Sequence, residues 1–302
     1  MTTLAPTYRP LVGMFWMFAA GVSFVVMTAL VKSLGSTMDP IQAAFIRFVF
    51  GLVFLLPALK LVLTTHLTRR HLTLFGIRGI VHAVAVMLWF FSMTQIPLAE
   101  VTAMNYMTPV YVTLGAALFL GEKLAFRRIA AICVAIIGVI IILRPGFREI
   151  SAGHLTMLGT SLGLGGSYLI AKALVRDLPP SVVVAHMSIW VTIALIPFAV
   201  AVWTPPSLRD LGVLFLVASF ATAGHYFMTI ALKAAPVAVT QPVTFLQLIW
   251  ATLVGALVFH ESVDAWVVAG GTLILSAVSF IAWREAVLNR GNLTTPSIAP
   301  KI

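Results

Sequence analysis

The feature that most constrains this chain is its division into apolar stretches, each followed by a short break that carries proline, glycine or charge. A helix of about 20 apolar residues spans the hydrocarbon core of a bilayer. Only 9% of the residues are charged, whereas soluble domains carry about 25%. So few charges cannot cover a soluble surface, so the chain must expose apolar surface to lipid. We expect an all-α integral membrane protein, because helices satisfy their own backbone in lipid.

Ten stretches are predicted to cross the membrane. They lie at 11–32, 41–62, 73–95, 99–120, 128–145, 154–174, 181–203, 209–231, 237–259 and 265–284. The first is too long for the hydrophobic region of a cleaved signal peptide and is expected to be retained. With the N-terminus in the cytoplasm, the inside segments hold 13 Lys and Arg residues and the outside segments four. This bias predicts that both termini are cytoplasmic.

The net charge of +10 does not indicate a nucleic-acid partner, because the basic residues lie in short clusters between apolar stretches. The single cysteine, Cys133, excludes internal disulfides and cysteine-based zinc sites. We expect no metal and no cofactor. Gly159 to Gly163 matches G-x-S-x-G in spelling, but it falls in a predicted membrane helix rather than a strand-to-helix turn. We therefore predict no catalytic residues and no enzymatic activity.

The two halves of the chain resemble each other. Prolines and glutamates recur at an offset of 139 or 140 residues, in the pairs Pro40 and Pro180, Pro97 and Pro236, and Glu122 and Glu261. Each half holds five predicted spans, and an odd number places the second copy upside down in the membrane. Inverted repeats are typical of secondary transporters, whose substrate site lies near the midplane. We predict repeats over residues 1–148 and 149–288 around a central cavity, followed by a cytoplasmic tail over 289–302.

The motifs of the fourth and ninth spans point to a known family. The first runs from Pro97-Leu98-Ala99 through Pro109 to Leu120-Gly121-Glu122, and the second runs from Pro236-Val237-Ala238 to Glu261, with His260 in place of the glycine. Over about residues 11–285 the chain resembles the EamA type of the drug/metabolite transporter superfamily. The resemblance implies a ten-helix bundle of the bacterial inner membrane that works by alternating access.

Within that superfamily the sequence is similar to members that move riboflavin or S-adenosylmethionine. The resemblance implies uptake of a small amphipathic metabolite such as riboflavin by a monomer embedded in the lipid bilayer. The alternatives are S-adenosylmethionine transport, and export of aromatic amino acids or other metabolites. A channel is disfavoured because the polar stripes are too sparse to form a continuous lining. An intramembrane enzyme is disfavoured because no catalytic pair is evident.

Polar and aromatic residues within the spans are the candidates for substrate binding, because polar groups in a membrane usually face the bundle interior. Arg78, His82 and Trp89 share one face of the third span. The other candidates come from the fourth, sixth, eighth and ninth spans: Asn105, Tyr106, Tyr168, His225, Tyr226, Gln241, Thr244 and Gln247. The alternatives are that Arg78 extends to the lipid headgroups and that hydroxyl and amide groups only pack helices together.

Two further features bear on mechanism. Arg47 lies in the middle of the second span without a local acid, and either stabilises the fold or attracts an anionic substrate. Ion coupling commonly uses a carboxylate buried in a span, and the spans were judged to hold no deeply placed Asp or Glu. We therefore predict facilitated or exchange transport. Pro109 is expected to kink the fourth span, because proline lacks the backbone N–H group.

Overall fold

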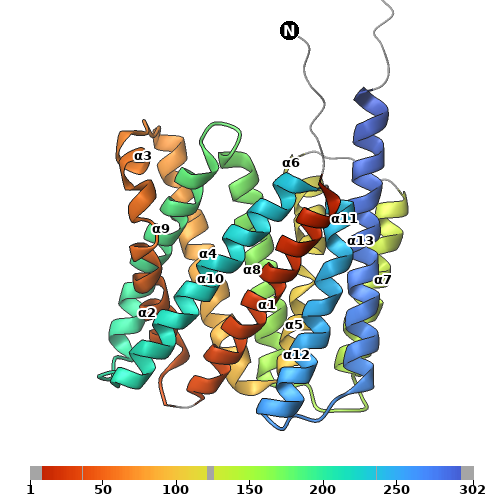
Figure 1. Ribbon diagram of the computed structural model, residues 1–302. Coiled ribbons are helices and arrows are strands. Elements are labelled where there is room, and N and C mark those ends of the chain that lie inside the picture. The colour runs from red at the N-terminus through yellow and green to blue at the C-terminus, as the bar shows by residue number, and fades with distance from the viewer. Residues whose placement is uncertain (1–8, 36, 121–125, 236, 294–302) are drawn as a thin grey trace, which may run out of the picture.

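The computed structural model describes residues 9–35, 37–120, 126–235 and 237–293, and these form a bundle of helices without a strand (Figure 1). The first half holds α1 (Pro10–Leu34), α2 (Pro40–Val53), η1 (Leu56–Ala58), α3 (Leu59–Thr64), α4 (Arg69–Gln95), α5 (Leu98–Asn105), α6 (Thr108–Leu120) and α7 (Phe126–Leu143). The second half holds α8 (Ala152–Leu174), α9 (Pro180–Ala201), α10 (Leu208–Ala234), α11 (Val237–Thr240), η2 (Gln241–Thr244), α12 (Phe245–Val258) and α13 (Ala265–Leu293).

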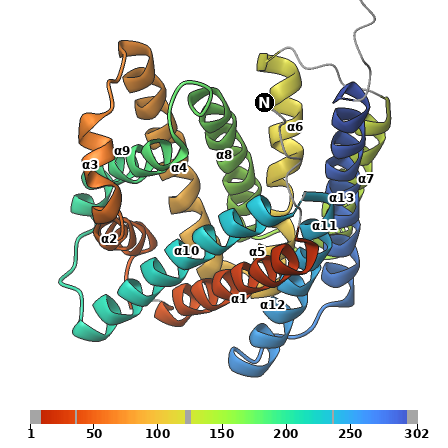
Figure 2. The same ribbon diagram turned by 45° about the horizontal axis from the view of Figure 1, so that its top comes forward.

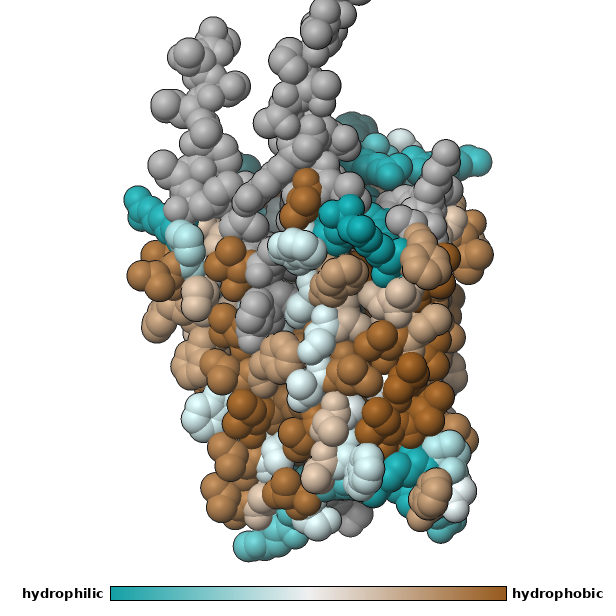
Figure 3. Space-filling view, turned by 90° about the vertical axis from the view of Figure 1, so that its right-hand side faces the viewer, coloured by the Kyte–Doolittle hydropathy of each residue, from teal (hydrophilic) through white to brown (hydrophobic). Residues whose placement is uncertain are grey.

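Six of the described helices are long and apolar enough to cross a membrane, namely α1, α4, α7 and most of α9, α10 and α13. Their outer faces are apolar, and Leu11, Phe119 and Phe126 are each about four-fifths exposed. In Figure 3 hydrophobic residues form a broad band between two ends that carry hydrophilic ones. Such a band matches the hydrocarbon layer of a bilayer, so the chain is a multi-pass membrane protein.

The most extensive helix contacts join the two halves of the chain. Helix α1 lies along α10, α4 along α8, and α7 along α13 (Figure 2), while α2 contacts α9 and α5 contacts α12. The pair α7 and α13 approaches closely at two glycines, because a Cβ atom on Gly138 would lie 2.7 Å from the carbonyl oxygen of Gly270. The two halves are therefore interleaved, and neither forms a separate core.

Three predicted spans are not continuous helices. The span at 41–62 is interrupted between α2 and α3 where Pro57 lies. The predicted effect of Pro109 is confirmed, since the helix stops at Asn105 and restarts at Thr108. In the span at 237–259, a 3-10 segment that contains Pro242 separates α11 from α12. Proline explains each break because it removes a backbone donor and clashes with the preceding turn.

Candidate functional site

The breaks in the fourth and ninth spans lie next to each other. The Tyr106 hydroxyl, in the turn between α5 and α6, donates a hydrogen bond of 3.0 Å to the backbone carbonyl oxygen of Thr244, at the end of η2. Asn105 ends α5, and its side-chain oxygen accepts from the Thr108 hydroxyl at 3.4 Å. Gln241 begins η2, but its side chain lies outside the described residues. Three of the predicted site residues therefore gather where the two broken spans meet.

A second group of predicted residues surrounds Ser167 of α8. Arg78 is only 3% exposed. Its Nε donates to the Ser167 hydroxyl at 3.2 Å, and its Nη1 donates to the Val183 carbonyl oxygen at 3.0 Å. Arg78 thus points into the bundle and not toward lipid headgroups. The Ser167 hydroxyl also lies 3.0 Å from Nδ1 of His82.

These contacts bear on the hydrogen-bonding role of His82. The Ser167 hydroxyl accepts from Arg78, and its second lone pair or its own proton serves Nδ1 of His82. We assign the tautomer in which Ser167 donates to Nδ1 and the proton of His82 lies on Nε2. Phe48 of α2 meets the imidazole edge-on, with ring centres 6.1 Å apart. His82 is held on both sides, with its Nε2–H as the remaining donor.

Arg47 and His225 extend this group to α2 and α10. The Arg47 guanidinium lies 4.2 Å from the centre of the Phe48 ring, and the His225 ring lies 5.1 Å from that of Phe24 in α1. His82 interacts electrostatically with Arg78, Arg47 and His225, and His225 also interacts with Arg47. We call Arg47, Arg78, His82 and His225 the interior basic cluster.

Tyr168 borders this cluster. It interacts electrostatically with Arg78, yet 41% of its surface is accessible, and His225 is exposed as well. Both side chains therefore remain accessible while they interact with groups on neighbouring helices. The sequence predicted only part of the cluster, because it left the role of Arg47 open and did not single out Ser167.

The other predicted residues lie apart from the cluster in the described part of the chain. Trp89 is half-buried against the core, and its ring packs edge-on to Phe90. Tyr226 is 64% exposed and contacts Phe227. Gln247 faces α1, where its Cβ would lie 3.8 Å from a Cβ on Gly21. For these three residues, no contact among the described side chains connects them to Arg78 or His82.

The end of the bundle opposite the start of α1 is held by a charged clamp, which we define as Lys32, Glu100, Arg144, Arg148, His154, Glu261 and Asp264. Arg148, in the loop after α7, binds both carboxylate oxygens of Glu100, at 2.9 and 2.7 Å. The hydrogen bond and the charge of Glu100 raise the pKa of Arg148 above its usual value. His154, at the start of α8, lies 2.6 Å from Glu100. Arg144 pairs with Asp264 just before α13.

The other half of the clamp joins α1 to α5 and to the loop after α12. Lys32 pairs with Glu261 and also donates to the Ile96 carbonyl oxygen at 2.9 Å. The second carboxylate oxygen of Glu261 accepts from the backbone N–H of Leu98 at 2.9 Å. Lys32 therefore does not simply extend into solvent at the end of its span. These contacts close the helix ends together on this side.

Glu100 is an acid that the sequence did not single out. It is the third residue of α5, at the edge of its predicted span, so the absence of an acid deep in a span stays a prediction. It is 4% exposed. The sequence did contain a signal, since Arg144 and Arg148 follow the fifth span without a nearby acid of their own apart from Glu149. The carboxylate partner of Arg148 lies 48 residues away in sequence.

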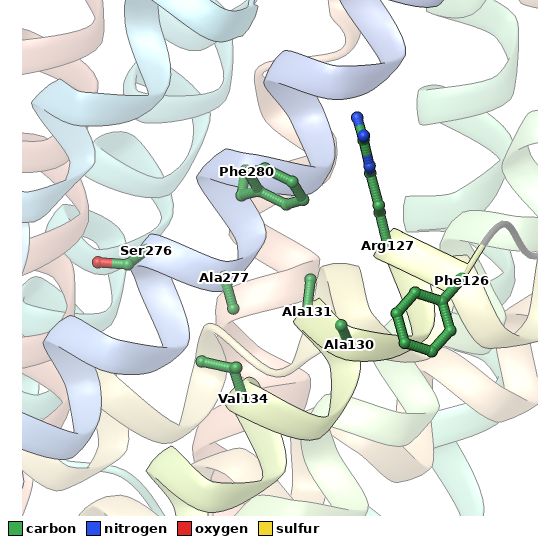
Figure 4. A pocket seen from close by; sticks show the side chains of 8 residues that line it. All are labelled: Phe126, Arg127, Ala130, Ala131, Val134, Ser276, Ala277 and Phe280. Atoms are coloured by element: carbon green, nitrogen blue, oxygen red, sulfur yellow. The ribbon is translucent and has the colours of Figure 1, made fainter.

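A groove between α7 and α13 is not the candidate site. Figure 4 shows it lined mainly by apolar side chains, with Phe126 and Arg127 at one end and Phe280 on the facing helix. None of the predicted site residues lines it. Its apolar lining and position on the hydrophobic surface suit contact with lipid.

Comparison with known proteins identifies the family. The EamA-like transporter family matches residues 11–144 and again residues 151–283. The chain belongs to this family. It is a transporter of the drug/metabolite superfamily, as the motifs around Pro97 and Glu261 indicated. The two matches fall on the two halves that the offset of prolines and glutamates had separated.

Named relatives cover nearly the whole chain. A riboflavin transporter of Rhizobium johnstonii is 32% identical over 289 residues, which are 92% of this chain and 93% of that protein. An S-adenosylmethionine uptake transporter of Rickettsia prowazekii is 22% identical and covers 90% of this chain and 93% of its own. A pseudopaline exporter of Pseudomonas aeruginosa is 26% identical over 85% of this chain and 91% of its own.

The fold also resembles a solved structure. One crystal structure matches with a TM-score of 0.61 and 16% identity, covering 90% of this chain and 98% of its own. At this identity the likeness concerns the fold alone. The transporter assignment rests on the family and on the named relatives.

Proposed function

We propose that this transporter takes up riboflavin, or a flavin closely similar to it, across the bacterial inner membrane by alternating access. The observation that carries the proposal is the riboflavin transporter of Rhizobium johnstonii, which aligns with 92% of this chain at 32% identity. A second riboflavin transporter, of Brucella anthropi, is 27% identical over 82% of this chain. Both are similar along most of the chain and not only in a shared motif.

The chemistry of the site supports a flat substrate rich in hydrogen-bond acceptors. The flavin ring carries two carbonyl oxygens on an aromatic plane. Arg78 and the Nε2–H of His82 are donors, and the rings of Phe48 and Tyr168 lie beside them. We propose that the substrate contacts some of the eleven predicted residues, from Arg78 on α4 to Gln247 on α12.

The helix contacts support two inverted repeats of five spans. Counting α2 with α3, α5 with α6, and α11 with α12 as broken spans gives ten crossings in all. In such a repeat α1 corresponds to α8, and α4 corresponds to α10. The contact between α1 and α10 then has an equivalent in the contact between α8 and α4, and both are observed. The pairs α7 with α13, and α2 with α9, map onto themselves. Broken helices near the midplane are also typical of such transporters.

The distribution of basic residues supports placing the start of α1 and the end of α13 on the cytoplasmic side. Figure 1 draws both at the same end of the bundle. The charged clamp then lies on the outer side. We propose that the repeats divide near residue 148, that the tail after residue 288 is cytoplasmic, and that the monomer is the working unit.

S-adenosylmethionine is the second candidate, since relatives of that name cover about as much of the chain. It carries a sulfonium cation. The interior basic cluster brings two arginines and two histidines close to one another, which repels a cation. S-adenosylmethionine also carries a carboxylate, which such a cluster attracts, so the order of the two candidates rests on the higher identity of the riboflavin transporter.

Uptake into proteoliposomes tests the proposal. Riboflavin flux is expected to saturate with concentration and to fall when Ser167→Ala breaks the link between Arg78 and His82. Ser219→Ala is the matched control, because that hydroxyl bonds only to the Phe215 carbonyl oxygen of its own helix. Saturable flux of S-adenosylmethionine without any flux of riboflavin would replace the first candidate by the second.

A further inference from the structure

We propose that the interior basic cluster binds an anionic group of the substrate, so that a flavin bearing a phosphate ester or carboxylate is bound more tightly than neutral riboflavin. That the substrate contains a flavin ring rests on the proposed function. That it carries an anionic group rests on the structure of the cluster. Arg47 is the residue expected to bind the anionic group.

The first step is that Arg47 has no carboxylate partner among the described residues. In the described part of the chain its one contact is with the face of its neighbour Phe48. The residue is partly buried. Its guanidinium nitrogens nevertheless do not count among the buried side-chain atoms without a hydrogen-bond partner. They are therefore accessible. A guanidinium offers five N–H donors, and no hydrogen bond to a described residue uses those of Arg47.

The second step is that no described acid pairs with the cluster: Glu149 is exposed in the loop after α7, and the other described acids are engaged elsewhere. Within the described ranges, Asp39 caps α2, Asp177 pairs with Arg70, and Asp210 bonds to Ser207. The remaining ion-paired acids are Glu100, Glu261 and Asp264, which belong to the charged clamp. An unpaired charge inside a membrane protein is costly. Its presence is explained if a ligand supplies the counter-charge.

The third step is that the donors converge from both halves of the chain. Arg47 comes from α2, His82 from α4 and His225 from α10, and the three interact electrostatically with one another. Helix α2 contacts both α4 and α10. An anion placed among them would meet the Arg47 guanidinium, the Nε2–H of His82 and the accessible imidazole of His225. Low local polarity strengthens each of these attractions.

Arg78 has a different part in this arrangement. Three of its donors already bond to Ser167, Val183 and Met187. It holds His82 in place through Ser167 and adds positive charge. Arg78 has two donors left, whereas no hydrogen bond to a described residue uses those of Arg47, so the anion is expected to bind mainly at Arg47.

A pair of ligands with one ring system tests this inference. Riboflavin and flavin mononucleotide differ only in a phosphate group, which carries close to two negative charges at neutral pH. We expect the purified protein to bind flavin mononucleotide about tenfold more tightly than riboflavin, measured by quenching of flavin fluorescence. Arg47→Gln is expected to abolish this preference, because it weakens the binding of flavin mononucleotide more than that of riboflavin. Arg209→Gln, at an exposed position on α10, is the control and is expected to keep the preference.

The outcomes separate the inference from the proposed function. Equal affinity for the two flavins in the wild-type protein would overturn the inference and leave flavin transport standing. If neither flavin binds, thermal stabilisation by phenyl phosphate, compared with phenol, is measured instead. Stabilisation that depends on Arg47 would support the anion site and reject the flavin, and its absence would reject both. Should Arg47→Gln fail to fold, Arg47→Lys keeps the charge and is expected to retain part of the preference. Loss of the whole preference in a folded Arg47→Lys variant would contradict charge recognition.

Discussion

In the proposed orientation, the ion pair between Lys32 and Glu261 holds the outer end of the transporter closed. Glu261→Gln removes the charge but leaves one side-chain oxygen for the backbone N–H of Leu98. Lys32 keeps only its bond to the Ile96 carbonyl oxygen. Removing one member of a buried ion pair costs about 3–5 kcal/mol, whereas an exposed pair contributes about 0–1 kcal/mol. The two side chains are 16% and 14% exposed.

That exposure, together with the remaining bond of Lys32, places the expected cost between the two limits, at about 2 kcal/mol. A change of this size shifts the equilibrium toward the outer-open state about 30-fold. An outer-open population of about 1% would then rise to about a quarter of the molecules. The shift concerns the conformational equilibrium and not the folding of the bundle.

Distances between spin labels measure this population. Ser33 and Val263 are exposed on either side of the ion pair, and cysteines at both positions can be labelled after Cys133→Ala removes the native thiol. Glu261→Gln is expected to add a longer distance. Asp177→Asn is the matched control, since its partner Arg70 is 68% exposed. An unchanged distance distribution in folded Glu261→Gln protein would show that the pair does not close the outer end.

Three further results are expected. Tyr106→Phe removes the hydrogen bond to the Thr244 carbonyl oxygen. It is expected to lower the free energy of unfolding by about 1 kcal/mol and to slow uptake. Unchanged thermal stability and uptake would contradict this. Gly138→Val forces side-chain atoms against the Gly270 backbone and is expected to cost about 1–3 kcal/mol or more, seen as loss of the monodisperse peak in size-exclusion chromatography. Gly212→Val, where nothing lies within 4 Å of the added Cβ, is its control. Riboflavin flux at a fixed membrane potential is expected to survive a protonophore, and its abolition would show proton coupling.

The positions of the spans followed from hydropathy, but the behaviour of their prolines did not follow from local sequence. Pro57 and Pro197 occupy equivalent places in the two halves. The helix is interrupted at Pro57, whereas Pro197 lies inside a continuous α9. Proline weakens a helix in both places, and the neighbouring helices decide whether the backbone breaks.

The candidate site was predictable where its residues share one helix. Arg78 and His82 are four residues apart, so their common face could be read from the sequence. Ser167 could not be predicted as part of the site, because it lies 89 and 85 residues away from Arg78 and His82 in sequence. For Arg47 the sequence left structure and anion binding open, because the distribution of acids in space decides between them. Glu100 was missed because its partner Arg148 lies in a distant loop.

The broken spans connect the clamp to the site. Helix α5 starts at Leu98, whose N–H is held by Glu261, and ends beside Tyr106, which binds the Thr244 carbonyl oxygen. Its contacts are mainly with α12, α13 and α8, whereas α6 beyond the break packs on α8. Opening the clamp frees the first end of α5, and the break at Asn105 lets α5 tilt without carrying α6 with it. Motion at the outer end then reaches the Tyr106 hydroxyl directly, so the contact between the two breaks is expected to loosen whenever the clamp opens.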